Sequence, residues 1–145
     1  MSTGLYEHDF YAWANQQAAL LRAGDLSVAD IEHIAEEIES MGKTEKRELV
    51  SRLSVLLMHL LKWQAQPERR GRSWRSTITI QRHALADHLT DNPSLRSSLD
   101  QALVRAYDNA RLGAIGESDL PESFFPSECP WPFEPIMDEE FWPSR

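Results

Sequence analysis

The chain has 145 residues, of which 41% are hydrophobic and 26% are charged, so we expect a single globular domain that buries a core without metal or disulfide support. Its formal net charge of −8 argues against a general nucleic-acid binder, because phosphate binding needs a basic face. The sequence has no apolar run of roughly 18–20 residues, no basic and apolar leader, and a single cysteine, so we expect a cytoplasmic protein without a membrane span or disulfide framework.

Two amphipathic helices are predicted near the N-terminus. The first covers residues 8–23 and ends at Gly24, because glycine commonly closes a helix in the left-handed conformation. The second follows a capping arrangement at Ser27 and Asp30, and its apolar face is formed by Ile31, Ile34, Ala35, Ile38 and Met41. Gly42 interrupts this pattern and Thr44 offers a new cap, so we expect the helix to break or kink there.

The most apolar segment predicts a central helix from Leu49 to about Gln66. Its leucines form a stripe wide enough to be covered from two sides, as in the middle helix of a bundle. Pro67 ends the helix, because the residue before a proline disfavours helical geometry.

A fourth and a fifth helix complete the predicted bundle. Ser73 is the expected cap of the fourth helix, which includes the β-branched run 77–80 because the apolar residues after it keep helical spacing. Asn92-Pro93 predicts the start of the fifth helix, with the cap before a proline in the first turn. This helix is expected to fray near Gly113 and Gly116.

The composition changes after Gly116, since residues 117–145 combine six prolines with six aromatic side chains. The prolines rule out a long helix, whereas each buried ring removes about 150–250 Å² from water and so favours ordered packing. We therefore predict an all-α fold, with about five helices in an up-down bundle over residues 1–116 and an extended arm over residues 117–145 packed on the same domain. The arm has eight acidic side chains and one arginine, a net charge of −7.

Several short segments, in this order along the chain, are similar to those of a known family. They are residues 5–13 (LYEHDFYAW), Glu36-Glu37, residues 59–63 (HLLKW), Ser73-Trp74 with Thr77-Ile78, Arg82, residues 93–95 (PSL), Tyr107, residues 126–130 (PSECP) and residues 141–143 (FWP). In this combination the chain resembles the bacterial "domain of unknown function 29" family over essentially its whole length. The resemblance implies a small, all-helical, cytoplasmic bacterial protein. It brings no established activity, so no catalytic residue is carried over.

Polar and aromatic residues of the predicted helices form a candidate interaction or structural cluster, which consists of Glu36, Glu37, His59, Lys62, Trp63, Trp74 and Arg82. His59, Lys62 and Trp63 share one helix face, where they could form a pocket for an anion or a partner carboxylate. We favour a helix-end cluster in which the cationic side chains complement the dipole at the helix C-terminus and Trp63 belongs to the core. Arg82 lies beside an apolar face, and a buried charge needs a partner. We expect an ion pair of Arg82 with Glu36 or Glu37 in preference to a bound ligand.

A metal site is the alternative that would make the protein an enzyme. Glu37, His59 and His83 are the candidate ligands, because histidine and carboxylate side chains that project into a bundle hold metal ions. The sequence has no HExxH, CxxC or repeated ExxH motif, so we expect neither a metal nor another cofactor. Cys129 adjoins Glu128, whose negative charge stabilises the thiol, so we expect a packed cysteine and not a nucleophile.

A basic loop follows the central helix and carries Arg69, Arg70, Arg72 and Arg75. Arginines beside an aromatic residue are suited to phosphate and base contact, so local nucleic-acid binding through this loop is a second alternative. A competing use is internal, with the acidic arm lying across the loop. Because no catalytic motif is found, our interpretation is a non-catalytic protein-interaction or regulatory module, whose partner and oligomeric state do not follow from the sequence.

Overall fold

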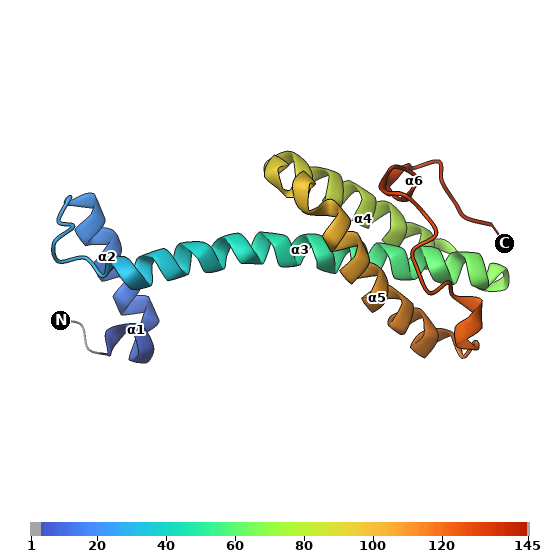
Figure 1. The fold of residues 1–145 in the computed structure, drawn as a ribbon, viewed down its shortest axis with the longest axis horizontal. Coiled ribbons are helices and arrows are strands. Elements are labelled where there is room, and N and C mark those ends of the chain that lie inside the picture. Colours follow the sequence, from blue (N-terminus) through green and yellow to red (C-terminus); the bar gives the residue numbers. More distant parts are fainter. Residues whose placement is uncertain (1–3, 145) are drawn as a thin grey trace. The chain divides into compact units, whose positions relative to one another are not determined.

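A computed structural model describes residues 4–144 (Figure 1). Its α-helices are α1 (Leu5–His8), α2 (Phe10–Arg22), α3 (Ile31–Ala65), α4 (Arg72–Asp91), α5 (Leu99–Ser118) and α6 (Phe133–Met137). Short 3-10 turns cover Pro67–Arg69, Pro93–Ser98 and Glu122–Phe124. No strand occurs among the described residues, which confirms the predicted all-α class.

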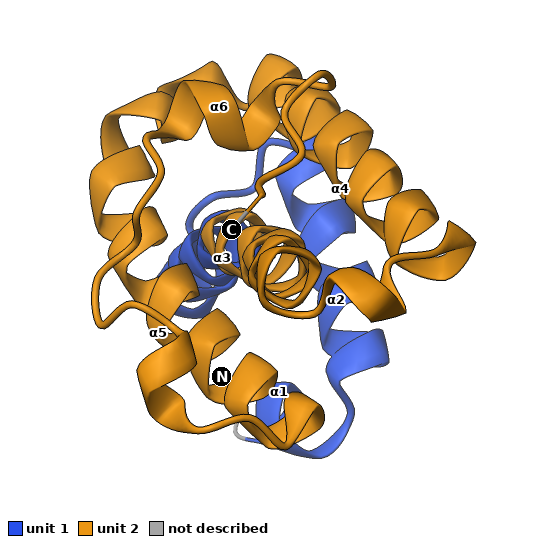
Figure 2. Cartoon of the chain, turned by 90° about the vertical axis from the view of Figure 1, so that its right-hand side faces the viewer, with its two compact units in different colours: residues 1–44 blue, residues 45–145 orange. Residues whose placement is uncertain are grey.

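The chain divides into two compact units, residues 1–44 and residues 45–145 (Figure 2). In unit 1, the side chain of Asp9 caps α2 by accepting a hydrogen bond of 3.1 Å from the Ala12 N–H. Gly24 follows α2 with a φ of 74°, so the predicted left-handed stop is confirmed. Of the predicted capping pair Ser27 and Asp30, Asp30 immediately precedes α3 and accepts a hydrogen bond of 3.4 Å from the His33 N–H. The Ser27 hydroxyl instead donates to the Asp25 carboxylate.

The helix α3 runs without interruption through Gly42, so the predicted break there is wrong. One glycine weakens a helix by only about 1 kcal/mol, which the hydrogen bonds of the turns on either side outweigh. The expected cap residue Thr44 instead donates its hydroxyl to the Ser40 carbonyl one turn earlier, at 3.0 Å. The second and third predicted helices are therefore one element.

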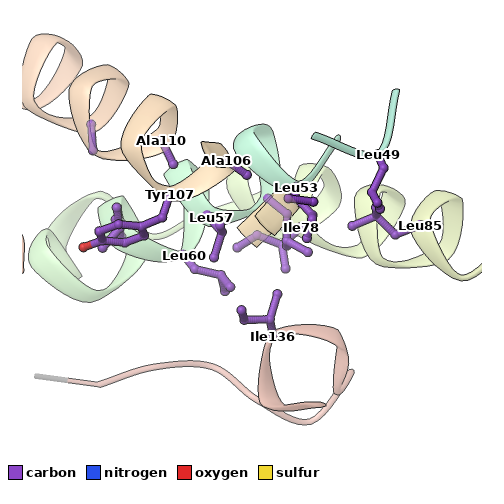
Figure 3. Packing of buried hydrophobic residues seen from close by; sticks show 14 of the residues in the cluster. Leu49, Leu53, Leu57, Leu60, Ile78, Leu85, Ala106, Tyr107, Ala110 and Ile136 are labelled. Atoms are coloured by element: carbon purple, nitrogen blue, oxygen red, sulfur yellow. The ribbon is translucent and has the colours of Figure 1, made fainter. Parts of the chain in front are cut away.

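In unit 2, α4, α5 and the arm lie around the second half of α3 (Figure 2). Six leucines of α3 are almost fully buried, as the predicted central helix requires. They are Leu49, Leu53, Leu56, Leu57, Leu60 and Leu61. Figure 3 shows several of them against Ile78 and Leu85 of α4, Tyr107 of α5 and Ile136 of α6. The core therefore combines side chains from three long helices and the arm.

Two of the predicted helix starts in unit 2 are corrected by the structure. The first residue of α4 is Arg72, after Gly71, so Ser73 lies within the first turn and does not cap the helix. The segment that begins at Pro93 is a 3-10 turn, and α5 begins only at Leu99. This helix then continues through Gly113 and Gly116 to Ser118, because packing against the core outweighs the weak helix propensity of glycine.

The arm is held to the helices at buried points along its length. Phe125 and Ile136 are almost fully buried, and α6 forms within the segment that was predicted to be extended. The Tyr107 hydroxyl donates to the Pro126 carbonyl at 2.6 Å, and burial raises the pKa of Tyr107 to about 12. Burial also raises the pKa of the Cys129 thiol, which donates to the Trp131 carbonyl.

Candidate functional site

A hydrogen-bonded aromatic cluster joins α1, α2 and the first turns of α3 in unit 1. The Tyr6 hydroxyl donates to the Glu37 carboxylate, and the Tyr6 ring stacks on the His33 ring with centroids 3.9 Å apart. Asp30 accepts from His33 Nδ1 at 2.7 Å and from the Trp13 indole N–H at 3.1 Å. These contacts fix α3 against the two shorter helices.

The same contacts shift the pKa values of the cluster in defined directions. The hydrogen bond to Glu37 raises the pKa of Tyr6 to about 12, because the protonated phenol is the donor. The hydrogen bond between His33 and Asp30 raises the pKa of His33 and lowers that of Asp30, because it favours the charged form of each. The predicted cluster residue Glu37 is therefore part of the internal structure of unit 1.

The surface of unit 1 combines exposed apolar side chains with strong negative charge. On α3, the exposed fractions of Ile31, Ile38 and Met41 are 50%, 63% and 68%. Other exposed apolar residues of the unit are Phe10, Tyr11, Leu21, Leu26 and Val28. Residues 1–44 have eight acidic side chains against Arg22 and Lys43, a net charge of −6.

The structure brings four members of the predicted cluster, Lys62, Trp63, Trp74 and Arg82, close to the arm in unit 2. Lys62 is buried, and its ammonium donates to Glu117 at 2.7 Å while lying 5.0 Å from the Trp74 ring centroid. This hydrogen bond lowers the pKa of Glu117. Because Lys62 is already paired with Glu117, its ammonium group is not available to bind an anion at this point.

Arg82 is only 2% exposed, but its expected ion pair with Glu36 or Glu37 is not what the structure shows. Its Nε donates to the Ile136 carbonyl at 2.8 Å and its Nη2 to the Phe141 carbonyl at 2.7 Å. The guanidinium carbon lies 5.3 Å from the Trp142 ring centroid. Main-chain carbonyls and an aromatic ring of the arm thus take the place of the carboxylate that we predicted.

The arginines of the basic loop divide into two pairs. Arg70 donates to the Trp63 carbonyl at 2.6 Å and to the Pro143 carbonyl at 3.5 Å, and Arg75 stacks over the rings of Trp63 and Trp142. Arg69 and Arg72 are exposed, and so is Arg75, which combines its ring contacts with exposure to solvent. The arm therefore lies against two of the four arginines, through carbonyl oxygens and rings.

The three predicted metal ligands have separate partners. Glu37 accepts from Tyr6, His59 Nδ1 donates to the Val55 carbonyl at 2.8 Å, and His83 lies 3.2 Å from Glu139. Burial also lowers the pKa of His59. Within residues 4–144 one group of three side chains has the geometry to share an ion, and it consists of Glu45, Glu48 and His88.

Sequence reasoning missed this trio, although one of its signals was visible. Glu45 and Glu48 are three residues apart and so share a helix face, provided that α3 is already helical at Glu45. A helix interrupted at Gly42 would leave Glu45 outside regular helix, so the predicted break hides this shared face. His88 is distant in sequence, so only the packing of α4 on α3 brings it to the two glutamates.

Comparison with known proteins relates the chain to a family. No helix within residues 4–144 combines the length and apolar character that crossing a bilayer requires. No curated protein and no solved structure matches the chain. The family model described as "Domain of unknown function DUF29" matches residues 5–142, nearly the whole chain. The protein therefore belongs to this family.

Proposed function

We propose that the protein is a non-catalytic interaction module whose unit 1 binds a basic, amphipathic helix of a partner protein. The observation that carries this proposal is the exposed apolar stripe of α3, formed by Ile31, Ile38 and Met41, on a unit with a net charge of −6. Such a stripe is a surface that a helix can cover, and the charge selects the kind of helix.

The spacing of the stripe supports a helical partner. Ile31 and Ile38 are seven residues apart, and Met41 follows three residues later, with the half-buried Ile34 completing the repeat. Apolar residues at alternating spacings of three and four form the seam along which two helices pack. Each of the three exposed residues offers apolar surface whose removal from water contributes roughly 25 cal/mol per Å².

The charge of the unit favours a basic partner over a second copy of the chain. Glu32, Glu36 and Glu39 are exposed on the same helix as the stripe. Two copies paired through this seam would bring two surfaces of the same sign together, which costs binding energy. Lysine and arginine side chains beside the apolar residues of a partner would instead be attracted, and the attraction would weaken with salt.

The contacts in unit 2 support an interaction module over nucleic-acid binding through the basic loop. Arg70 and Arg75 are engaged with Trp63 and the arm. Arg75 is itself exposed, but its guanidinium lies over the Trp142 ring, so Arg69 and Arg72 are the loop arginines left for phosphate contact. Two cations supply little of the counterion release that drives binding to phosphates.

The test is the binding of a labelled synthetic helix with leucine at the seam positions and lysine and arginine beside them, followed by fluorescence anisotropy. The wild-type protein should bind it, and the double variant Ile38→Glu/Met41→Glu should bind at least about tenfold more weakly, because the change places charge in the seam. The matched control is Val104→Glu/Leu112→Glu, which alters two equally exposed apolar residues of unit 2 and should leave binding unchanged.

Two results would overturn the proposal. One is equal binding of a scrambled peptide of the same composition, which would reduce the interaction to charge alone. The other is self-association of the wild-type protein in sedimentation that disappears in Ile38→Glu/Met41→Glu, which would assign the stripe to a second copy of the chain.

A further inference from the structure

The beginning of unit 2 places two carboxylates of α3 opposite a buried histidine of α4. The His88 side chain is 7% exposed, and its Nδ1 lies 3.7 Å from Glu48 Oε2. Its Nε2 lies 3.6 Å from Glu45 Oε2 and 2.8 Å from the Glu45 carbonyl oxygen. One ligand atom from each of the three side chains lies within 4.8 Å of the other two.

The hydrogen bond to the Glu45 carbonyl fixes which histidine nitrogen can bind an ion. A carbonyl oxygen only accepts, so we place the proton of the neutral imidazole on Nε2. Nδ1 then has a free electron pair, and it lies 3.7 Å from the Glu48 carboxylate, beyond hydrogen-bond length. A histidine that donates one N–H to a main-chain carbonyl and offers the other nitrogen is the arrangement found at protein metal sites.

The separation of the two donor atoms also suits a shared ion. Zinc binds histidine nitrogen and carboxylate oxygen at about 2.0–2.2 Å, which leaves two ligands of one tetrahedral ion roughly 3.3–3.6 Å apart. The 3.7 Å between His88 Nδ1 and Glu48 Oε2 is close to this span. Arg52 Nε donates to this same oxygen, Glu48 Oε2, at 2.9 Å and so orients the carboxylate, whose second oxygen stays open to an ion. Arg52 is itself bonded to Gln81 of α4.

We propose that Glu45, Glu48 and His88 bind a divalent transition-metal ion of the Zn²⁺ class, which joins α3 to the C-terminal part of α4. The mixed nitrogen and oxygen ligands favour such an ion over Mg²⁺ or Ca²⁺, which take oxygen ligands. The two glutamates are partly exposed, so the site opens to solvent and has room for a water ligand. The site is independent of the docking surface proposed for unit 1.

The test is calorimetric titration of the metal-free, full-length protein with Zn²⁺. We expect one equivalent of Zn²⁺ to bind. Glu45→Gln/Glu48→Gln and His88→Gln should each weaken binding by about 10–100-fold or more, since changes even outside the direct ligands have effects of this size. The matched control is His83→Gln/Glu139→Gln, which removes a histidine–glutamate pair that includes another α4 histidine and should bind Zn²⁺ as the wild type does.

A second measurement separates loss of the site from loss of the fold. Zn²⁺ should raise the melting temperature of the wild type and of the control, but not of the Glu45/Glu48 variant, whose half-exposed side chains leave the core intact. In NMR spectra, Zn²⁺ should shift the ring signals of His88 and leave those of His83 in place. Absence of saturable binding to the wild type, or equal binding to the Glu45/Glu48 variant, would overturn the proposal.

Discussion

The two halves of α3 carry the same helical pattern of apolar residues but differ in how far those residues are buried. In unit 1 the apolar residues Ile31, Ile38 and Met41 are half or more exposed, whereas in unit 2 Leu49 and Leu56 are fully buried. Leu49 and Leu56 follow Ile38 by about three and about five turns in the register of the helix, so they continue the same stripe. The pattern of a helix therefore states which face is apolar, but the neighbouring elements decide whether that face is a core or a surface.

The difference lies in what covers each half. Residues of α4, α5 and the arm pack on the second half of α3 within unit 2. In unit 1, the short helices α1 and α2 contact α3 mainly through the cluster of Tyr6, Trp13 and His33. An exposed stripe on an otherwise ordered helix is the feature that the proposed function explains.

The largest effect should come from equal truncations in the two halves. Leu57→Ala should lower the free energy of unfolding by about 2–5 kcal/mol, because it leaves a cavity in a fully packed core. Ile38→Ala should change it by less than about 0.5 kcal/mol, because that side chain is mostly in water. Urea unfolding followed by circular dichroism measures both, and similar losses would contradict the contrast between the halves.

The next largest effect on stability tests whether the packing of the arm on the helices stabilises unit 2. Arg82→Lys should lower the free energy of unfolding by about 1.5–3 kcal/mol, because lysine cannot reproduce the two directed bonds to the Ile136 and Phe141 carbonyls. Arg75→Lys is the matched control, since exposed Arg75 contacts the same Trp142 ring, and it should cost no more than about 1 kcal/mol. Limited proteolysis should cleave the arm faster in the Arg82 variant alone.

A smaller effect, of the opposite sign, tests whether α3 is one helix across the boundary of the two units. Gly42→Ala should raise the free energy of unfolding by about 0.5–1 kcal/mol, because a Cβ at this helical position meets open space. Gly24→Ala should lower it, because alanine is strained at a φ of 74°. Destabilisation by both substitutions in thermal unfolding would place a break at Gly42.

The smallest effect is a difference in pH response between one histidine of each unit. The hydrogen bond to Asp30 raises the pKa of His33. The contribution of His33 to the free energy of unfolding is therefore fully present below about pH 6.5 and is lost as the pH rises through the folded-state pKa. Burial lowers the pKa of His59. The contribution of neutral His59 to the free energy of unfolding is therefore fully present above about pH 6.5 and is lost as the pH falls through the folded-state pKa.

Side-chain NMR titration measures both histidines in one sample. His33 should titrate above His59, and Asp30→Asn should lower the pKa of His33 while leaving that of His59 unchanged. Titration of the two histidines at the same pH would contradict the assignment of opposite causes.

The helices were predictable from the sequence because their signals are local. The leucine spacing of residues 49–61, the stop at Gly24 and the proline-rich composition of the arm each act over a few residues, and each corresponds to an observed feature. The wrong prediction at Gly42 has the same origin, because the low helix propensity of one residue is a local signal, whereas the two stretches of helix on either side decide whether the helix continues.

The site residues were harder to predict, because their partners are distant along the chain. The position of Arg82 beside an apolar face predicts that it needs a partner once buried, but no residue pattern indicates that main-chain carbonyls supply it. A carbonyl belongs to every residue and so leaves no trace in the sequence. The trio of Glu45, Glu48 and His88 depends likewise on the packing of α4 against α3.

The separation between Arg82 and its acceptors also sets an order of events during synthesis. The Ile136 and Phe141 carbonyls are made 54 and 59 residues after Arg82, about 3–12 s later at roughly 5–20 residues per second. Until then the guanidinium stays in water, because burying an unpaired charge is too costly. The Tyr6–Glu37 bond spans only 31 residues, so unit 1 is complete while the leucines of α3 still await their cover. A nascent chain paused in this interval presents the folded unit 1 together with an uncovered hydrophobic core, and at this stage it offers a chaperone the largest apolar surface to bind.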